Sequence, residues 1–246
     1  MKKRLLALVI AVLMLVGNAV PCLAAEAAIN PAAAAINPAP VDPAAATAGG
    51  YVLAGSCTTS LKGSSKNRIT NVTVAASRLN GLVIQPGQAV SISTAILPRT
   101  AENGYKMAGV YSGGKTVLGY GGGICQVSST LYNAAMNAGL SVAQRFPHSM
   151  PVSYLPLGQD AAISWGSKDL IITNPYDTPV MLSAAVDGKT ISTAVFVSNA
   201  SLAGRSYRFY AIKTGGLSAT SYRDCYLNGQ LVGTEVVANS KYAPHG

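Results

Sequence analysis

Apolar residues recur at helical spacing in two segments of the chain. The first segment starts at Asn67, a good N-cap residue, and runs to Leu79, with Gly81 as a stop signal. The second segment covers Ile124–Ala138 and is ended by Gly139. The pattern therefore predicts two amphipathic helices, both in the first part of the folded region.

The other apolar runs are short and often alternate with polar residues, as β-strands do. Asp187-Gly188 and Asn228-Gly229 are dipeptides typical of tight hairpin turns. We therefore expect an α+β fold, in which two main helices pack on a β-rich second half with antiparallel hairpins. The expected strands are residues 51–60, 82–84, 89–93, 115–118, 152–155, 161–165, 169–173, 180–186, 191–197, 207–212, 222–226 and 230–237.

The N-terminal residues differ from the rest of the chain. Residues 1–24 combine a basic start, the apolar run Leu5–Val16 and small residues for cleavage, which predicts a secretory signal peptide. The apolar run is shorter than the ~18–20 residues that span a membrane, and a retained anchor is the alternative. Residues 25–50 are rich in Ala and Pro and predict a solvated linker. We expect a secreted or extracytoplasmic protein associated with the cell envelope.

Composition supports a folded domain after the linker, and the net charge indicates which classes of binding partner to expect. Hydrophobic residues make up 49% of the chain and charged residues 11%, which is enough to fill a core. From Tyr51 onward, 15 Lys and Arg stand against 7 Asp and Glu, a net charge of +8. The basic residues are scattered singly, so nucleic-acid binding is not expected. Attraction to an anionic cell wall or membrane surface fits this charge better.

Three cysteines follow the predicted signal peptide: Cys57, Cys125 and Cys225. In an oxidising compartment an odd number leaves at least one thiol unpaired within the monomer. A disulfide between Cys57 and Cys225 would tie the two ends of the domain together and leave Cys125 free. Three unpaired buried thiols are the alternative, because sequence does not give the separation of the Cα atoms.

Cys125 stands in the first turn of the second predicted helix, shortly after a glycine cluster. Unpaired N–H groups and the positive end of the helix dipole favour a thiolate there and lower the pKa of the thiol. Gly121, Gly122 and Gly123 permit close approach of a substrate carbonyl and leave N–H groups free for an oxyanion. The position is typical of a nucleophilic cysteine, with a small buried cysteine as the alternative.

A nucleophilic cysteine needs a base. The sequence has two histidines, and His245 is next to the last residue, so His148 is the plausible base within the predicted domain. Asp160 or Asp169 would orient its imidazole. A histidine that only satisfies the backbone of a loop is the alternative. One Cys and one His fall short of the usual four zinc ligands, so neither a metal nor a cofactor is expected.

Further polar residues are candidates for contacting a substrate. Ser128, Ser129 and Tyr132 share one face of the second predicted helix, and they either line a pocket or cap a neighbouring loop. Arg99 and Arg145 would grip a substrate carboxylate through their forked donors, unless they are solvated surface residues.

Several motifs together resemble the VanW family, which takes its name from vancomycin-resistance gene clusters. The motifs are Asn67-Arg68-Ile69, Pro98-Arg99-Thr100-Ala101-Glu102-Asn103-Gly104-Tyr105, Gly121-Gly122-Gly123-Ile124-Cys125-Gln126-Val127-Ser128-Ser129-Thr130-Leu131-Tyr132, and His148-Ser149 followed by Pro151-Val152-Ser153-Tyr154. The resemblance covers about residues 51–198, and residues 199–246 are expected to form a β-rich C-terminal extension. It implies an envelope-associated domain of mainly Gram-positive bacteria, sometimes linked to glycopeptide resistance.

The expected function is thiol-dependent acyl transfer or hydrolysis on peptidoglycan stem peptides, by a Cys/His peptidase, amidase or transpeptidase. Cys125 would be the nucleophile, His148 the general base, and Asp169 or Asp160 the residue that orients the imidazole. The expected substrate-binding residues are Gly121, Gly122, Gly123, Gln126, Ser128, Ser129, Tyr132 and Arg99.

Two other functions remain open at this point. In the first, the same groove belongs to a non-catalytic peptidoglycan-binding module linked to glycopeptide resistance or envelope assembly. In the second, the domain is a structural partner in a sporulation or division complex. Trp165 would stack on a sugar ring of a wall ligand or else pack in the core.

Overall fold

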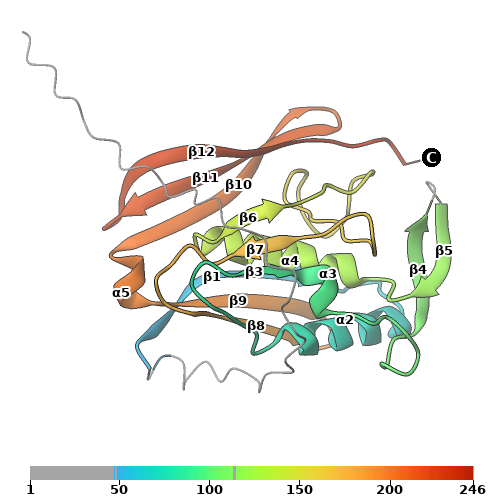
Figure 1. Cartoon of the computed structure of the whole chain (residues 1–246). Coiled ribbons are helices and arrows are strands. Elements are labelled where there is room, and N and C mark those ends of the chain that lie inside the picture. Colours follow the sequence, from blue (N-terminus) through green and yellow to red (C-terminus); the bar gives the residue numbers. More distant parts are fainter. Residues whose placement is uncertain (1–46, 48, 113–114, 246) are drawn as a thin grey trace, which may run out of the picture.

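The computed structural model describes residues 47, 49–112 and 115–245, which fold mainly into antiparallel β-sheets (Figure 1). The helices are α2 (Lys66–Leu79), α3 (Ile92–Ala95), α4 (Ile124–Asn137) and α5 (Asn199–Leu202). The strands are β1 (Tyr51–Ser60), β2 (Val83–Ile84), β3 (Ala89–Ser91), β4 (Met107–Ser112), β5 (Lys115–Tyr120), β6 (Ser141–Gln144), β7 (Ile171–Thr173), β8 (Val180–Val186), β9 (Thr190–Ser198), β10 (Arg205–Gly215), β11 (Ser218–Leu227) and β12 (Gln230–Lys241).

The strands form several separate sheets. The largest has four strands in the order β1-β9-β8-β2. One three-stranded sheet has the order β10-β11-β12, a second has the order β3-β7-β6, and β4 and β5 form a two-stranded hairpin. All these pairings are antiparallel.

The four-stranded sheet joins the beginning of the domain to a late part of the chain. β1 runs antiparallel to β9, with Tyr51 opposite Ser198 and Ser60 opposite Thr190. β8 leads into β9 through a tight turn, in which the Asp187 carboxylate accepts the Thr190 backbone N–H at 2.6 Å. This turn explains why the sequence pattern locates β8 and β9 well.

Helix α4 lies at the centre of the protein. It packs on β1 and β9 on one side and on β10 on the other, and Figure 1 shows it between these two sheets. Twelve of its 14 residues are buried. β1 approaches it so closely that a Cβ at Gly55 would lie 2.3 Å from the Ala134 carbonyl oxygen, so only glycine fits there. The helix is therefore a rigid support for the residues at its N-terminus.

The predicted fold class is wrong. Strands make up 42% and helices 19% of the described residues, in four helices and several antiparallel sheets, rather than two main helices on a β-rich second half. Strands β1 to β5 all precede α4, and β1 and β2 share a sheet with β8 and β9. The spacing of apolar residues along the chain predicts local helices and strands only. It does not reveal that strands from both halves of the chain pair with one another.

Some individual elements also differ from expectation. The N-cap of α2 is Ser65 rather than Asn67, because the Ser65 hydroxyl accepts the backbone N–H of Arg68 at 3.3 Å. Residues 152–155 and 161–165 form no strand in this described part of the chain, apart from one isolated bridge. Strands β4 and β6 were not expected, since their apolar alternation is weak.

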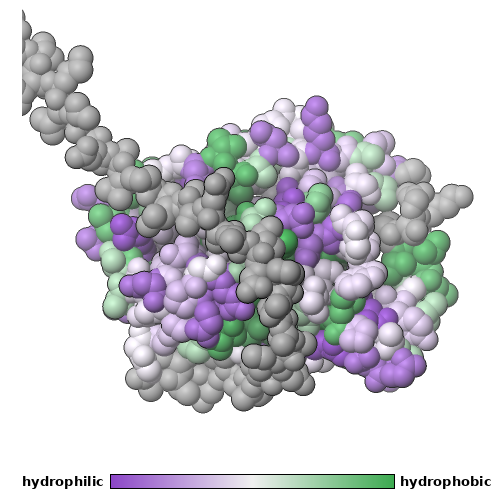
Figure 2. All heavy atoms as spheres, viewed as in Figure 1, coloured by the Kyte–Doolittle hydropathy of each residue, from purple (hydrophilic) through white to green (hydrophobic). Residues whose placement is uncertain are grey.

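The surface and the chain ends add two observations. Figure 2 shows hydrophobic surface over the β4–β5 hairpin, where Leu118 and Tyr120 are exposed.

Within the part of the chain that the structure describes, no helix has the length and apolar character needed to cross a membrane. The predicted signal peptide, residues 1–24, lies outside the described residues, as does the predicted linker, residues 25–50, apart from its last few positions.

Candidate active site

The candidate site begins at the N-terminus of α4. The β4–β5 hairpin ends at Tyr120, and three glycines follow before Ile124. Gly123 is the N-cap residue with φ of 108°, and a Cβ there would lie 2.8 Å from Cγ of Arg68. No side-chain hydrogen bond caps the helix. Because the first N–H groups of a helix have no partner within the helix, this end favours negative charge.

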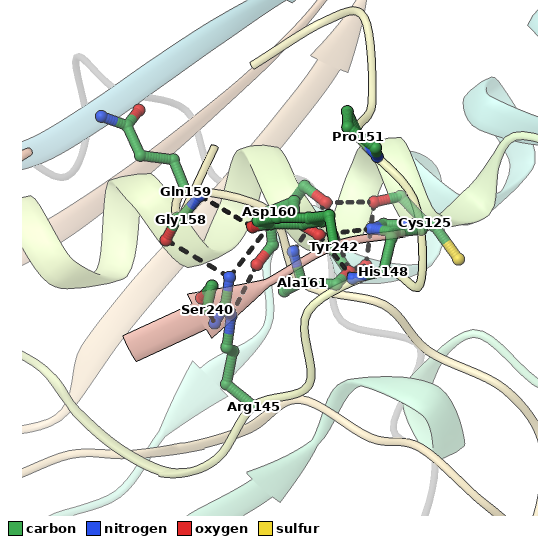
Figure 3. Close-up of polar contacts among 12 residues, drawn as sticks. Cys125, Arg145, His148, Pro151, Gly158, Gln159, Asp160, Ala161, Ser240 and Tyr242 are labelled. Atoms are coloured by element: carbon green, nitrogen blue, oxygen red, sulfur yellow. Dashed lines mark hydrogen bonds and ion pairs between the residues drawn. The ribbon is translucent and has the colours of Figure 1, made fainter. Parts of the chain in front are cut away.

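Cys125 lies in the first turn of α4 and is partly exposed. Its sulfur is 3.3 Å from the Ile163 carbonyl oxygen, which accepts the proton of the thiol form. The imidazole of His148 is also close enough to act on the pKa of the Cys125 thiol. Figure 3 shows Cys125 and His148 in one cluster with Asp160 and Tyr242.

Asp160 fixes the orientation of His148 through two hydrogen bonds to one carboxylate oxygen. Nδ1 of His148 lies 2.6 Å from Oδ2 of Asp160, and the His148 backbone N–H donates to the same oxygen at 2.6 Å. Because Nδ1 is engaged, Nε2 is the ring nitrogen left for the sulfur of Cys125. The side chain of His148 is 14% exposed and that of Asp160 only 1%. The three side chains thus lie in the order Cys-His-Asp, with the imidazole held by Asp160 and acting on the thiol of Cys125.

The other oxygen of Asp160 is held by residues from distant parts of the chain. Oδ1 accepts from Nη2 of Arg145 at 3.1 Å and from the hydroxyl of Tyr242. Arg145 also donates through Nη1 to the hydroxyl of Ser240 at 2.7 Å. Ser240 lies in β12 and Tyr242 follows it, so the C-terminal segment reaches the site (Figure 3).

Asp160 and His148 are both charged at neutral pH. Burial would raise the pKa of Asp160, but hydrogen bonds from His148 and Tyr242 and the charge of Arg145 bring it below its ordinary value. Burial would lower the pKa of His148, but its hydrogen bonds and charge interactions with Asp160 and Cys125 raise it to about 9. The imidazole therefore carries a proton across the physiological range.

The thiol of Cys125 has a pKa below its ordinary value. Burial opposes this by disfavouring the charged form, but the hydrogen bond and charge of His148, together with the charge of Arg99, outweigh it. Cys57 in β1 shows the effect of burial, which raises the pKa of its thiol to about 11. The geometry therefore supports a thiolate and imidazolium pair at Cys125 and His148.

The structure places one of the two candidate orienting carboxylates at the site. Asp160 contacts His148, whereas Asp169 accepts hydrogen bonds from the Ser91 hydroxyl and from the Ser93 backbone N–H, the latter at 2.9 Å. Asp169 thus caps the start of α3 and does not orient the imidazole. No group of three or more His, Cys, Asp or Glu among the described residues is arranged to hold a metal ion.

Three polar residues that were expected to contact substrate lie inside the protein instead. Ser128 and Ser129 are fully buried, and their hydroxyls donate to the Ala161 carbonyl oxygen at 2.7 and 3.2 Å. Gln126 is buried and donates to the Thr59 hydroxyl at 2.9 Å. These bonds tie α4 to β1 and to the segment that follows Asp160, so the three side chains serve the fold.

Two further expected binding residues also have structural contacts. Tyr132 is buried, and its ring meets the ring of Phe209 edge to face, with centroids 5.1 Å apart. Gly122 is buried against β4, where a Cβ would lie 2.5 Å from the Gly109 carbonyl oxygen. The absence of a side chain at Gly122 therefore permits packing of the hairpin on the helix entry, not the approach of a ligand.

Arg99 retains the character of a binding residue. Its Nη2 is buried and has no hydrogen-bond partner among the described residues. Its side chain passes beside the glycine cluster, since a Cβ at Gly121 would lie 3.1 Å from Cδ of Arg99. Its charge also lowers the pKa of Cys125. A buried guanidinium donor without a partner among the described residues is unusual, which makes Arg99 a candidate for binding an anionic group.

The expected disulfide is not formed. Cys57, Cys125 and Cys225 are free thiols. Cys57 lies opposite Thr193 in the four-stranded sheet, whereas Cys225 lies opposite Tyr207 in the sheet of β10, β11 and β12. The two strands belong to sheets on different sides of α4, so the two sulfurs are not brought together.

Tyr242 is the site residue that sequence reasoning missed. Its hydroxyl accepts the Gly158 backbone N–H at 2.7 Å and donates to Asp160. The next residue, Ala243, donates its backbone N–H to the Ser149 carbonyl oxygen at 2.7 Å. No local pattern signals this role, because Tyr242 is far along the chain from every residue that it contacts here.

Comparisons with known proteins match the region that carries this site. A family model described as "VanW like protein" matches residues 67–196. The chain is 37% identical over 145 residues to the uncharacterized protein YoaR of Bacillus subtilis (strain 168), covering 59% of this chain and 48% of that protein. It is 32% identical over 136 residues to the vancomycin B-type resistance protein VanW of Enterococcus faecalis (strain ATCC 700802 / V583), covering 53% and 50%. The chain thus spans about half the length of these curated relatives, and no solved structure matches it.

Proposed function

Because this chain belongs to the VanW family, and because its matched region carries a paired Cys and His, we propose that it is a thiol-dependent acyl transferase or hydrolase acting on peptidoglycan stem peptides. The observation that carries the proposal is the imidazole of His148, which Asp160 holds by a hydrogen bond and which lowers the pKa of the Cys125 thiol. The name of the Enterococcus faecalis relative, vancomycin B-type resistance protein VanW, supports a substrate in the cell envelope. Export to that compartment is part of the proposal.

In the first step the thiolate of Cys125 attacks the carbonyl carbon of an amide bond. A C–S bond forms, the π pair moves onto the oxygen, and the backbone N–H of Cys125 is the donor for the oxyanion, since the N–H groups of Ile124 and Gln126 donate to Gly121 and Gly123. The intermediate then collapses, the C–N bond breaks, and the imidazolium of His148 gives its proton to the leaving amine. The products of this step are a thioester on Cys125 and a free amine.

In the second step the thioester is resolved. His148, now neutral, takes a proton from water or from an acceptor amine as that nucleophile attacks the thioester carbonyl. The C–S bond breaks, the thiolate of Cys125 returns, and the imidazolium stays paired with it. Water gives a carboxylic acid and an amine gives a new amide. Asp160 remains ionised throughout and keeps the imidazole in one orientation.

Arg99 supports a substrate that carries a carboxylate close to the reacting bond. Nη2 of Arg99 is buried and has no hydrogen-bond partner within the described part of the chain, and the charge of Arg99 lowers the pKa of Cys125. A guanidinium matches a carboxylate through parallel hydrogen bonds. Stem peptides end in a carboxylate, so a bond near the peptide terminus is the one that this arrangement would place at the sulfur.

The test is turnover of purified muropeptides by the full chain, followed by mass spectrometry. Wild type, Cys125→Ser and Cys57→Ser are compared, because Cys57 is a second free thiol, remote in sequence and with a raised pKa. New fragments from wild type and Cys57→Ser, and none from Cys125→Ser, are the expected result. Equal turnover by Cys125→Ser would overturn the proposal.

A non-catalytic wall-binding module is the outcome if no variant turns over any muropeptide. Binding of the three proteins to purified insoluble peptidoglycan would then be measured by sedimentation. Retention of wild type and of Cys125→Ser to the same extent would assign the groove to binding alone. This outcome would also leave the low pKa of the Cys125 thiol without a role in chemistry.

A further inference from the structure

The chain carries a single tryptophan, and the structure places it on a short, hydrogen-bonded turn next to the candidate site. Trp165 is 69% exposed. Backbone hydrogen bonds of 2.8 and 3.0 Å between Ser164 and Lys168 close the turn on either side of it. The residue before the turn is Ile163, whose carbonyl oxygen contacts the sulfur of Cys125. The backbone of Trp165 is thus held two residues along the chain from the group that contacts the sulfur.

Trp165 lines one side of an open cavity of about 290 Å³. This volume is near the lower end of the range for small-molecule sites, ~300–1,000 Å³, and suits one ring-sized group. Most of the other lining side chains are polar. They include Ser93, Thr94, Gln144, Ser164 and Lys168.

One of these polar groups lacks a partner inside the protein. Ser93 is 5% exposed, and its hydroxyl has no hydrogen-bond partner among the described residues. Asp169 also lines the cavity, but its carboxylate is occupied by the Ser91 hydroxyl and the Ser93 backbone N–H. Buried hydroxyls are normally paired, so an unpaired one at a cavity wall points to a ligand that completes it.

We propose that this cavity is a saccharide subsite that binds one hexosamine ring. The apolar face of a pyranose ring stacks on the indole of Trp165, while its hydroxyl and acetamido groups bond to Ser93, Gln144 and the other polar lining side chains. An exposed aromatic plane beside hydrogen-bonding side chains, most of them neutral, suits a carbohydrate, which has apolar faces and polar edges. A purely apolar ligand would leave these polar groups unpaired.

The subsite deepens the proposed function and rests on it for its biological meaning. The cavity is lined by Ser164, and the sulfur contacts the carbonyl oxygen of the preceding residue, Ile163. A ligand that spans both would carry a sugar at one end and a peptide at the other. A muropeptide has that composition, so its sugar would position the stem peptide along Cys125.

Trp165 is its own reporter, because it is the chain's only tryptophan. The full chain is titrated with a tetramer of N-acetylglucosamine while its fluorescence is recorded, and binding is measured again by calorimetry. We expect a saturable change in the wild-type emission. Trp165→Ala and Ser93→Ala should each weaken binding, the former by about tenfold. Val236→Ala, which removes an exposed apolar residue of β12, is the control and should bind as wild type does.

Kinetics separate this inference from the proposed function. Trp165→Ala should lower kcat/KM for a muropeptide but not for the same stem peptide without its sugar. No change in emission, together with equal affinity of wild type and Trp165→Ala, overturns the subsite even if Cys125-dependent turnover is found. Saccharide binding that depends on Trp165 upholds the subsite even if no turnover is found.

Discussion

We expect Cys125 to be alkylated far faster than Cys57 at neutral pH, because His148 holds its sulfur as a thiolate. Burial raises the pKa of Cys57 to about 11, so at pH 7 about one molecule in ten thousand carries a thiolate there. An ordinary thiol, with a pKa near ~8.5, would be about 3% ionised at this pH. Even though a thiolate of low pKa is the weaker nucleophile, Cys125 should react faster than Cys57 by at least about a hundredfold.

The assay is alkylation of the full chain with iodoacetamide between pH 4 and pH 10, with each cysteine quantified by mass spectrometry after digestion. The midpoint for Cys125 should lie below that of an ordinary thiol, ~8.5. A smaller change should appear near pH 9, where His148 loses its proton. Turnover requires both the thiolate and the imidazolium, so it should rise through the lowered pKa of Cys125 and fall above about pH 9.

His148→Gln is the perturbation that tests the cause. It removes the charge and the hydrogen bond that oppose burial, so the midpoint for Cys125 should move above its ordinary value while that for Cys57 stays unchanged. An identical midpoint in wild type and His148→Gln would refute the reasoning. So would a wild-type midpoint at or above ~8.5, since Cys125 would then be an ordinary, partly exposed thiol.

Three further changes test other parts of the site. Tyr242→Phe removes a hydrogen bond to the Asp160 carboxylate, and it should cost about 1.5–3 kcal/mol of unfolding free energy in denaturant titrations and lower kcat more than KM; an unchanged kcat would contradict its positioning role. Gly123→Ala should destabilise the protein by about 1–3 kcal/mol, and by more than Gly63→Ala, which has the same left-handed backbone but open space around it; equal losses would show that the steric contact has no effect. Arg99→Gln should lower kcat/KM about tenfold or more for stem peptides that end in a carboxylate, but not for the same peptides with an amidated terminus, and equal losses on both would contradict carboxylate binding.

The regular elements are predictable where turn residues delimit them. The Asp187-Gly188 turn places β8 at Val180–Val186, as expected, and the apolar stripe places α4 to within one residue at its end. Strand pairing is not predictable in this way, because β1 and β9 are joined by contacts between residues far apart in the chain. The same limit explains the wrong fold class.

The candidate site is predictable from the sequence where the chain offers few residues of the required type, such as histidine. Cys125 follows from its position after the glycines, and His148 from the lack of other internal histidines. The choice between Asp160 and Asp169 is not available to sequence reasoning, since both follow His148 and both precede strand-like residues. Ser128 and Ser129 of α4 were expected to bind substrate but are buried. Helix spacing shows which residues share a face, but it does not show whether that face contacts solvent or protein.

The support for Asp160 extends beyond the region that defines the family. The family match ends at residue 196, yet Tyr242 and Ser240 bind Asp160 and its partner Arg145. The position of the carboxylate therefore depends on how the sheet of β10, β11 and β12 packs on α4. A carboxylate that moves releases Nδ1 of the imidazole and removes the interaction that raises the pKa of His148. The C-terminal strands are thus coupled to the protonation of the site, although they contribute no group that contacts the sulfur.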